Sequence, residues 1–133
     1  MANKKLNWKT WLQEGDQYLR AYGTKSRFGT EIRYNLISMS FEAYTMAILD
    51  FHNSLPENHT YSDLMYALET VVPIDKTLRE RILKYENIQS ICSIEKYHTV
   101  KPTEEELADL KGAILEISAL AHKTCPIDTA LAS

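Results

Sequence analysis

Residues 30–55, TEIRYNLISMSFEAYTMAILDFHNSL, decide the fold because they contain neither glycine nor proline. Gly29 precedes this stretch and Pro56 follows it, so 26 residues lie between the two breakers. As a helix the stretch would be about 39 Å long, at about 1.5 Å per residue. β-Strands are much shorter and need turn residues far more often. The stretch therefore predicts one long helix.

Two adjacent faces of this expected helix carry no charged side chain. Large apolar residues repeat at helical spacing on one face: Ile37, Phe41, Tyr44, Ile48, Phe51 and Leu55. Mostly small residues form the other face: Leu36, Ser40, Ala43 and Ala47. An apolar arc this wide is typical of the central helix of a bundle. The small side chains predict that a second helix approaches closely on their face.

Upstream of this stretch, an apolar stripe predicts another helix. Apolar residues run from Trp8 to Tyr22 at spacings of three and four. Gly23 follows directly, and glycine commonly terminates helices.

Downstream, three segments begin with residues that typically cap helices. Thr60 opens the first of them, and Asp75 opens the second, which we expect to continue through Ile91. Thr103 opens the third, with Glu106 three residues later as its capping-box partner.

Together these segments predict an all-α protein, a single antiparallel bundle of about five helices with mostly antiparallel neighbours. We expect the bundle over residues 5–124, with short tails at 1–4 and 125–133. Residues 93–101, SIEKYHTVK, have weak helical periodicity, and we interpret them as an ordered loop. Only four glycines and four prolines are present, which excludes an all-β sandwich and a disordered chain.

Composition also predicts the cellular compartment in which the protein works. No run of 18 apolar residues is present, so no membrane span is expected. The first residues, MANKKLNWKTW, have no apolar core of the kind that signal peptides carry, which predicts a cytoplasmic protein. Cys92 and Cys125 have no CxxC spacing, so we expect free thiols in a reducing compartment.

Charge is distributed unevenly along the chain. Residues 1–33 carry seven basic and three acidic side chains, whereas the whole chain has a net charge of −3. A basic end could attract phosphate. Ordinary charged helix surfaces explain the pattern equally, as does electrostatic pairing between two copies of the chain. The acidic overall balance argues against tight nonspecific binding of duplex DNA or RNA.

Motifs for metal binding or covalent catalysis are missing. Helical bundles that hold two irons need two Glu-x-x-His motifs, and this chain has one, Glu95 with His98. It contains no Gly-x-Ser-x-Gly, no Walker loop and no GxGxxG. We therefore predict no metal, no cofactor and no catalytic residue of these types.

Most aromatic residues lie on the apolar stripes. Trp8, Trp11, Phe41 and Phe51 are expected in the core. Four tyrosines are less tied to a stripe and could line a cleft or a subunit interface: Tyr34, Tyr61, Tyr66 and Tyr97.

Two histidines lie in expected loops. His59 could act as an acid or base near neutral pH, or could fix the entry of the following helix by hydrogen bonding. His98 lies with Lys96, Tyr97 and Lys101 in an irregular segment, where functional residues are common. An exposed loop histidine without a role is the alternative for His98.

The run NLISMSFEAYTMAILDFHNSLPENHTYSDLMYAL, residues 35–68, resembles the HEPN family of small helical-bundle proteins. In that family a long second helix with small residues and an embedded glutamate leads to a Pro-x-x-His turn. Here SFEA at residues 40–43 leads to PENH at residues 56–59. A leucine-containing third helix follows in the family, and residues 63–64, Asp-Leu, match it. The loop around Tyr97 and the glutamate-rich start of the last helix also look like the family.

This resemblance covers about residues 5–124 and implies an antiparallel bundle that is commonly a homodimer. Family members act as nucleotide-binding partners of small nucleotidyltransferases, or as metal-independent RNases in toxin–antitoxin and defence systems. The RNases carry arginine, four to six residues, and then histidine. That spacing is missing here, because His98 follows Arg81 by seventeen positions.

The sequence therefore predicts a non-catalytic HEPN-like bundle that binds a nucleotide, a single-stranded RNA segment or a partner nucleotidyltransferase. Its expected contact residues are Arg33, Glu42, Lys96, Tyr97 and His98.

Two other functions stay open at this point. In a metal-independent RNase with a degenerate site, His98 would accept the ribose proton and Lys96 or Lys101 would stabilise the phosphate charge. A dimeric interaction scaffold without a ligand is the other alternative.

Overall fold

The computed structural model describes residues 7–24, 29–86 and 102–125. Its helices in these ranges are α1 (Asn7–Thr24), α2 (Thr30–Phe51), α3 (Tyr61–Val71), α4 (Lys76–Leu83) and α6 (Glu104–Thr124). All the regular secondary structure of the described residues is helical. The predicted all-α bundle is thus confirmed.

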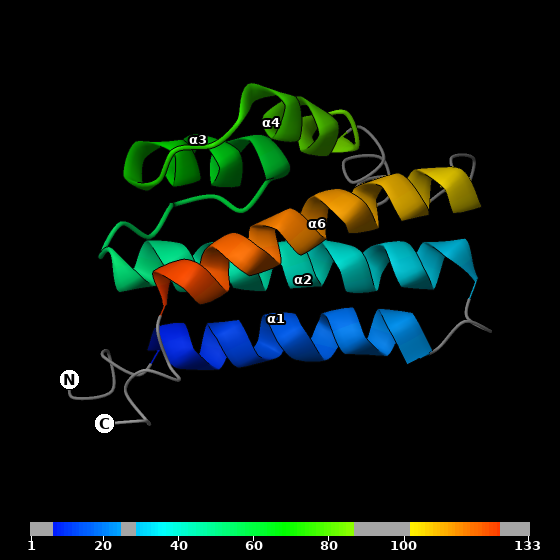
Figure 1. The fold of residues 1–133 in the computed structure, drawn as a ribbon, viewed down its shortest axis with the longest axis horizontal. Coiled ribbons are helices and arrows are strands. Elements are labelled where there is room, and N and C mark those ends of the chain that lie inside the picture. Colours follow the sequence, from blue (N-terminus) through cyan, green and yellow to red (C-terminus); the bar gives the residue numbers. More distant parts are fainter. Residues whose placement is uncertain (1–6, 25–28, 87–101, 126–133) are drawn as a thin grey trace.

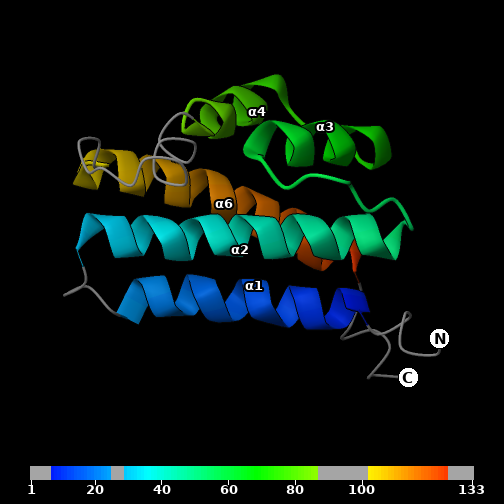
Figure 2. The same cartoon turned by 180° about the vertical axis from the view of Figure 1, so that it is seen from behind.

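Helix α2 lies at the centre of the bundle, with α1 on one side, α6 across it, and α3 and α4 in a layer beyond (Figures 1 and 2). Every side chain from Ala43 to Asp50 is buried, so neighbours surround this half of α2 on all sides. The prediction of a central helix is confirmed. On its small-residue face, the Ser40 hydroxyl donates a 2.9 Å hydrogen bond to the carbonyl of Gly15 in α1, which confirms the expected close approach.

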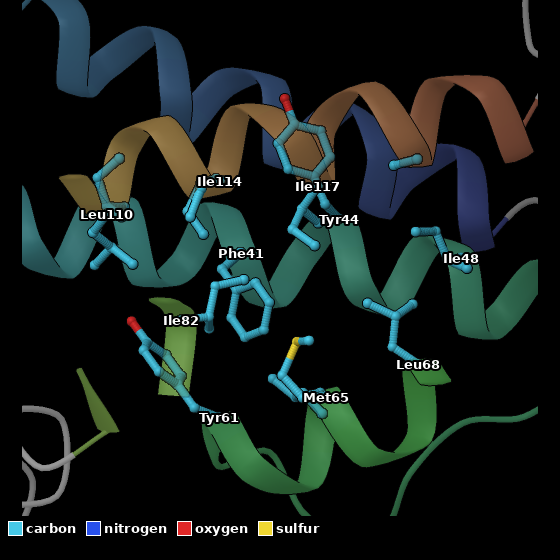
Figure 3. Packing of buried hydrophobic residues seen from close by; sticks show 14 of the residues in the cluster. Phe41, Tyr44, Ile48, Tyr61, Met65, Leu68, Ile82, Leu110, Ile114 and Ile117 are labelled. Atoms are coloured by element: carbon cyan, nitrogen blue, oxygen red, sulfur yellow. The ribbon is translucent and has the colours of Figure 1, made fainter. Parts of the chain in front are cut away.

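Helix direction follows a simple pattern. The pairs α1–α2 and α3–α4 are antiparallel, as expected for sequence neighbours, but α2 and α3 are an exception, because α3 and α6 both run in the same direction as α2 (Figures 1 and 3). Arg33 at the start of α2 contacts Glu104 at the start of α6, and Cys125 just after α6 contacts Ala47 late in α2. The chain between α2 and α3 runs back alongside α2, so α3 starts beside Phe41 and runs parallel to α2 (Figure 1).

Helix starts lie where the capping residues predicted them. The Thr60 hydroxyl accepts from the Asp63 N–H at 3.1 Å, and the Asp75 carboxylate accepts from the Thr77 N–H at 3.1 Å. The side chain of Thr103 and that of its capping-box partner each accept a backbone hydrogen bond, at 3.0 and 2.9 Å. These three helix starts are confirmed.

The fourth helix is shorter than the sequence predicted. It ends at Leu83, and the N–H of Tyr85 bonds the carbonyl of Ile82 at 3.1 Å, three residues back, instead of continuing the α-helical pattern. An uninterrupted helix through Lys84 and Tyr85 was therefore a wrong prediction. Residues 87–91, where we expected the helix to end, lie outside the described residues.

The core draws its side chains from all five described helices, and Figure 3 shows its central part. The rings of Phe41 and Tyr61 meet edge to face at 5.1 Å between centroids. Tyr34 is also buried, and its hydroxyl donates to the Tyr85 carbonyl at 3.2 Å. Tyr34 and Tyr61 are thus core residues, whereas Tyr66 is exposed.

Phe51 is a correction to the expected core. It is 38% exposed, because it is the last residue of α2 and the chain turns away directly after it. Its ring meets the half-buried ring of Trp8 edge to face at 5.3 Å. Trp11 is likewise only half-buried, so of the four aromatic residues expected in the core Phe41 alone is fully enclosed.

Cys125 lies at the end of the described chain and is buried. We placed residue 125 in the C-terminal tail, yet its thiol contacts the carbonyl of Ala47 at 3.6 Å. Burial, together with the nearby Asp50 carboxylate, raises the pKa of this thiol to about 12. Cys125 is therefore a protonated thiol at neutral pH, whereas Cys92 lies outside the described residues.

None of the helices in the described ranges combines the length and the apolar composition needed to cross a bilayer.

Candidate functional site

Arg33 is the sequence-predicted residue with the most defined geometry. Its guanidinium donates two hydrogen bonds to the Glu104 carboxylate, Nη1 to Oε1 at 3.0 Å and Nη2 to Oε2 at 2.5 Å. The Arg33 side chain is only 12% exposed, whereas that of Glu104 is 70% exposed. The hydrogen bond raises the pKa of Arg33 and lowers that of Glu104. Arg33 is thus an enclosed, forked cation with a solvent-exposed acidic partner.

Three helices meet around this guanidinium. Tyr22 near the end of α1 is half-buried, and burial raises the pKa of its phenol. The Lys111 ammonium of α6 lies 5.5 Å from the centroid of the Tyr22 ring. We call Tyr22, Arg33, Glu104 and Lys111 the Arg33 site. Its forked donor suits an anion with two oxygens in one plane, such as a carboxylate or a phosphate.

Glu42 lies on the opposite side of α2 from Arg33. Nine residues separate them, and about 100° per residue places them about 180° apart around the helix. Glu42 contacts His59 instead, with Oε2 at 2.5 Å from Nδ1. The structure therefore does not bring Glu42 into the Arg33 site. The contact also favours the interpretation that His59 fixes the entry to α3.

Lys96, Tyr97 and His98 lie outside the described residues, as does Lys101. Their expected role in the site stays a prediction. Pro102 is where the described chain resumes, two residues before Glu104.

Sequence reasoning missed a second convergence of polar side chains, between α1, α2 and α6. Asp16 Oδ1 accepts a hydrogen bond from the Tyr44 hydroxyl and lies 2.9 Å from His122 Nε2. Burial, and then the bond to Asp16, raises the pKa of Tyr44. Because 106 residues separate Asp16 from His122, no local spacing could have indicated the contact. The one available signal was that a buried tyrosine needs a partner for its hydroxyl.

A third polar cluster joins α4 to α6. The Tyr85 hydroxyl donates to Asp109 at 2.6 Å, and the Arg81 guanidinium bonds both Asp109 and Glu116. The hydrogen bond from Tyr85, with Lys84 and Arg81 nearby, lowers the pKa of Asp109. Each cation here already has acidic partners, so we interpret the cluster as a structural contact between two helices.

Within the three described ranges, no group of three His, Cys, Asp or Glu side chains could hold a metal ion. Comparison of the chain with protein families, with curated proteins and with solved structures finds no match. The HEPN resemblance therefore rests on the residues quoted from the sequence.

Proposed function

We propose that this chain is a non-catalytic, HEPN-like helical bundle that binds a nucleotide or a single-stranded RNA segment through the Arg33 site. As the resemblance implies, it would work as a homodimer, and a small nucleotidyltransferase would be its partner protein. As the first residues of the sequence predict, it would work in the cytoplasm. Lys96, Tyr97 and His98 are proposed to complete the contact with the ligand.

The enclosed guanidinium of Arg33 is the observation that supports this proposal most. An arginine held in place loses little side-chain freedom on binding, and its two parallel N–H donors match the oxygens of a phosphate. Lys111 of α6, which lies over the Tyr22 ring, is proposed as a second cation. A phosphate group is therefore the ligand chemistry best suited to this end of the bundle.

The missing RNase spacing favours binding over catalysis. His59 and His122 each lie against a carboxylate, Glu42 and Asp16 respectively. The arginine–histidine spacing of the family's RNases is missing from the whole sequence. His98, which lies outside the described residues, stays the predicted histidine for RNA cleavage in the alternative function.

Fluorescence anisotropy with a labelled adenosine monophosphate and a labelled short RNA tests the proposal. We expect Arg33→Lys to weaken binding about tenfold, because lysine keeps the charge but loses the forked donor, a loss of about 1.4 kcal/mol. Arg79→Lys is the matched control, because it makes the same change at an arginine ion-paired to Glu69 on the α3–α4 layer. Equal binding by the wild type and Arg33→Lys, or no binding of either probe, would contradict the proposal.

The alternatives have separate readouts. Metal-independent cleavage of the RNA that is lost in His98→Ala would establish the RNase. Light scattering on the purified chain measures the oligomeric state, and a monomer would contradict the homodimer.

A further inference from the structure

Glu104 occupies the position at Arg33 that an anionic ligand would take. The two oxygens of its carboxylate accept hydrogen bonds from the two terminal nitrogens of the guanidinium, at 3.0 and 2.5 Å. A carboxylate and a phosphate present their oxygens to arginine in the same two-point geometry. Glu104 and a phosphate therefore cannot use this edge of Arg33 at the same time.

The two partners differ in how firmly they are held. Arg33 is largely enclosed, whereas most of the Glu104 side chain is in solvent. Because most of its side chain is in solvent, the glutamate has room to rotate away from Arg33 into water. An exposed partner of this kind contributes little net free energy.

The start of α6 does not depend on Glu104 for its position. The capping box of Thr103 and Glu106 satisfies the first backbone groups, and Leu107 and Leu110 are buried in the core. Loss of the ion pair should therefore leave α6 in place. This separates the Arg33–Glu104 contact from a purely structural ion pair whose removal would disturb the helix.

We infer that Glu104 is a built-in competitor, an autoinhibitory contact that must swing away from Arg33 before a phosphate group binds. The inference rests on the proposed function, since it concerns the same site. The phosphate can come from a mononucleotide, as a monoester, or from the backbone of an RNA strand, as a diester. Binding by either route exchanges one anion for another at Arg33 and involves no covalent step.

Removal of the competitor should strengthen binding. We expect Glu104→Gln to bind the labelled adenosine monophosphate, the labelled RNA, or both about two- to fivefold more tightly than the wild type, the range that corresponds to an exposed ion pair. The probe whose affinity increases more identifies the source of the phosphate. Inorganic phosphate should compete for the same site, and should do so at lower concentration against Glu104→Gln.

Glu105→Gln is the matched control for overall charge. Glu105 lies in the same first turn of α6 and is exposed, so this variant removes the same charge near the helix start without touching the hydrogen bonds between Glu104 and Arg33. We expect its affinity to change less than twofold. The double variant Arg33→Lys/Glu104→Gln should not show this increase in affinity, because the forked donor of Arg33 is gone. Thermal unfolding monitored by circular dichroism checks that each variant is folded.

The outcomes separate the inference from the proposed function. Wild-type binding that depends on Arg33 but is unchanged or weakened in Glu104→Gln would overturn the inference alone. An equal gain in Glu105→Gln would also overturn it, because bulk charge would then explain the effect. No binding by the wild type or by Glu104→Gln would overturn the proposed function and the inference with it.

Discussion

Two helix contacts in this bundle each include a glycine, and they are built in opposite ways. At the α1–α2 contact, a Cβ on Gly15 would lie 2.7–2.9 Å from ring atoms of the buried Tyr44. At the α4–α6 contact, a Cβ on Gly112 would lie 3.0 Å from Nη2 of Arg81. The first glycine faces a ring that neighbours hold on all sides, and the second faces the end of a long, half-exposed side chain.

The difference shows how each contact resists change. The Tyr44 ring is fixed by burial and by the bond of its hydroxyl to Asp16, so the α1–α2 contact has no room to adjust. The Arg81 guanidinium can shift by a few tenths of an ångström and keep one of its acidic partners. We therefore expect the α1–α2 contact to be sensitive to volume and the α4–α6 contact to be sensitive to charge.

The largest effect is expected for Gly15→Ala. The added methyl group overlaps the Tyr44 ring, at a cost that exceeds the gain in helix propensity, so the free energy of unfolding should fall by about 2 kcal/mol. Urea denaturation measures this change. Gly23→Ala is the control, because a Cβ there meets nothing within 4 Å, and its effect should be small. Unchanged stability in Gly15→Ala would show that α1 and α2 are not in tight contact.

Asp109→Asn should remove the negative charge of Asp109 from the α4–α6 contact. The free energy of unfolding should then fall by about 1–2 kcal/mol at neutral pH. The pKa of Asp109 is lowered from its ordinary value of 3.8, mainly by the Tyr85 hydroxyl, so the unfolded chain binds this proton more readily. The wild type therefore loses this stability as the pH falls below about 4. Urea denaturation at several pH values should show that the free energies of unfolding of the wild type and of Asp109→Asn become similar in acid. Glu80→Gln, which changes an exposed residue of α4, is the control, and its free energy of unfolding should depend on pH as that of the wild type does.

Tyr44→Phe should cost about 1 kcal/mol, because the buried ring stays and the hydrogen bonds of its hydroxyl to Asp16 and Ser118 are lost. Burial raises the pKa of Tyr44 above its ordinary value of 10.0, so the unfolded chain releases this proton first. Stability of the wild type should therefore fall above about pH 10, and less steeply in the variant. A stability difference that does not change between neutral and alkaline pH would contradict this reasoning.

The smallest effect is expected for Gly112→Ala. The gain in helix propensity offsets the small displacement of Arg81, so the free energy of unfolding should stay within about 0.5 kcal/mol of the wild type. A loss as large as that of Gly15→Ala would remove the distinction between the two contacts.

Local features of the structure were predictable from the sequence. The starts of α3, α4 and α6 followed from Thr60, Asp75 and Thr103, because a cap bonds backbone groups only two or three residues away. The end of α4 was not predictable in this way, since the apolar pattern continues through Tyr85 although the backbone turns there. Phe51 continued the apolar stripe of α2, yet periodicity carries no information on where the neighbouring helices end.

The candidate site was predictable only in part. Glu42 was predicted from the resemblance and Arg33 as a further contact residue, yet their spacing alone places them on opposite sides of α2. Their partners, Glu104 and His59, could not be read from spacing. The convergence of Asp16 with Tyr44 and His122 was invisible in the sequence, since each residue comes from a different helix.

The sequence by itself determined the all-α class, the long central helix and the small-residue face on which α1 packs. Helical hydrogen bonds, caps and apolar periodicity act over a few residues, so they are present in the linear chain. Only the tertiary structure decided that α6 runs parallel to α2 and that Glu104 forms an ion pair with Arg33. These features depend on which buried surfaces distant segments share, and burial is a property of the whole folded chain.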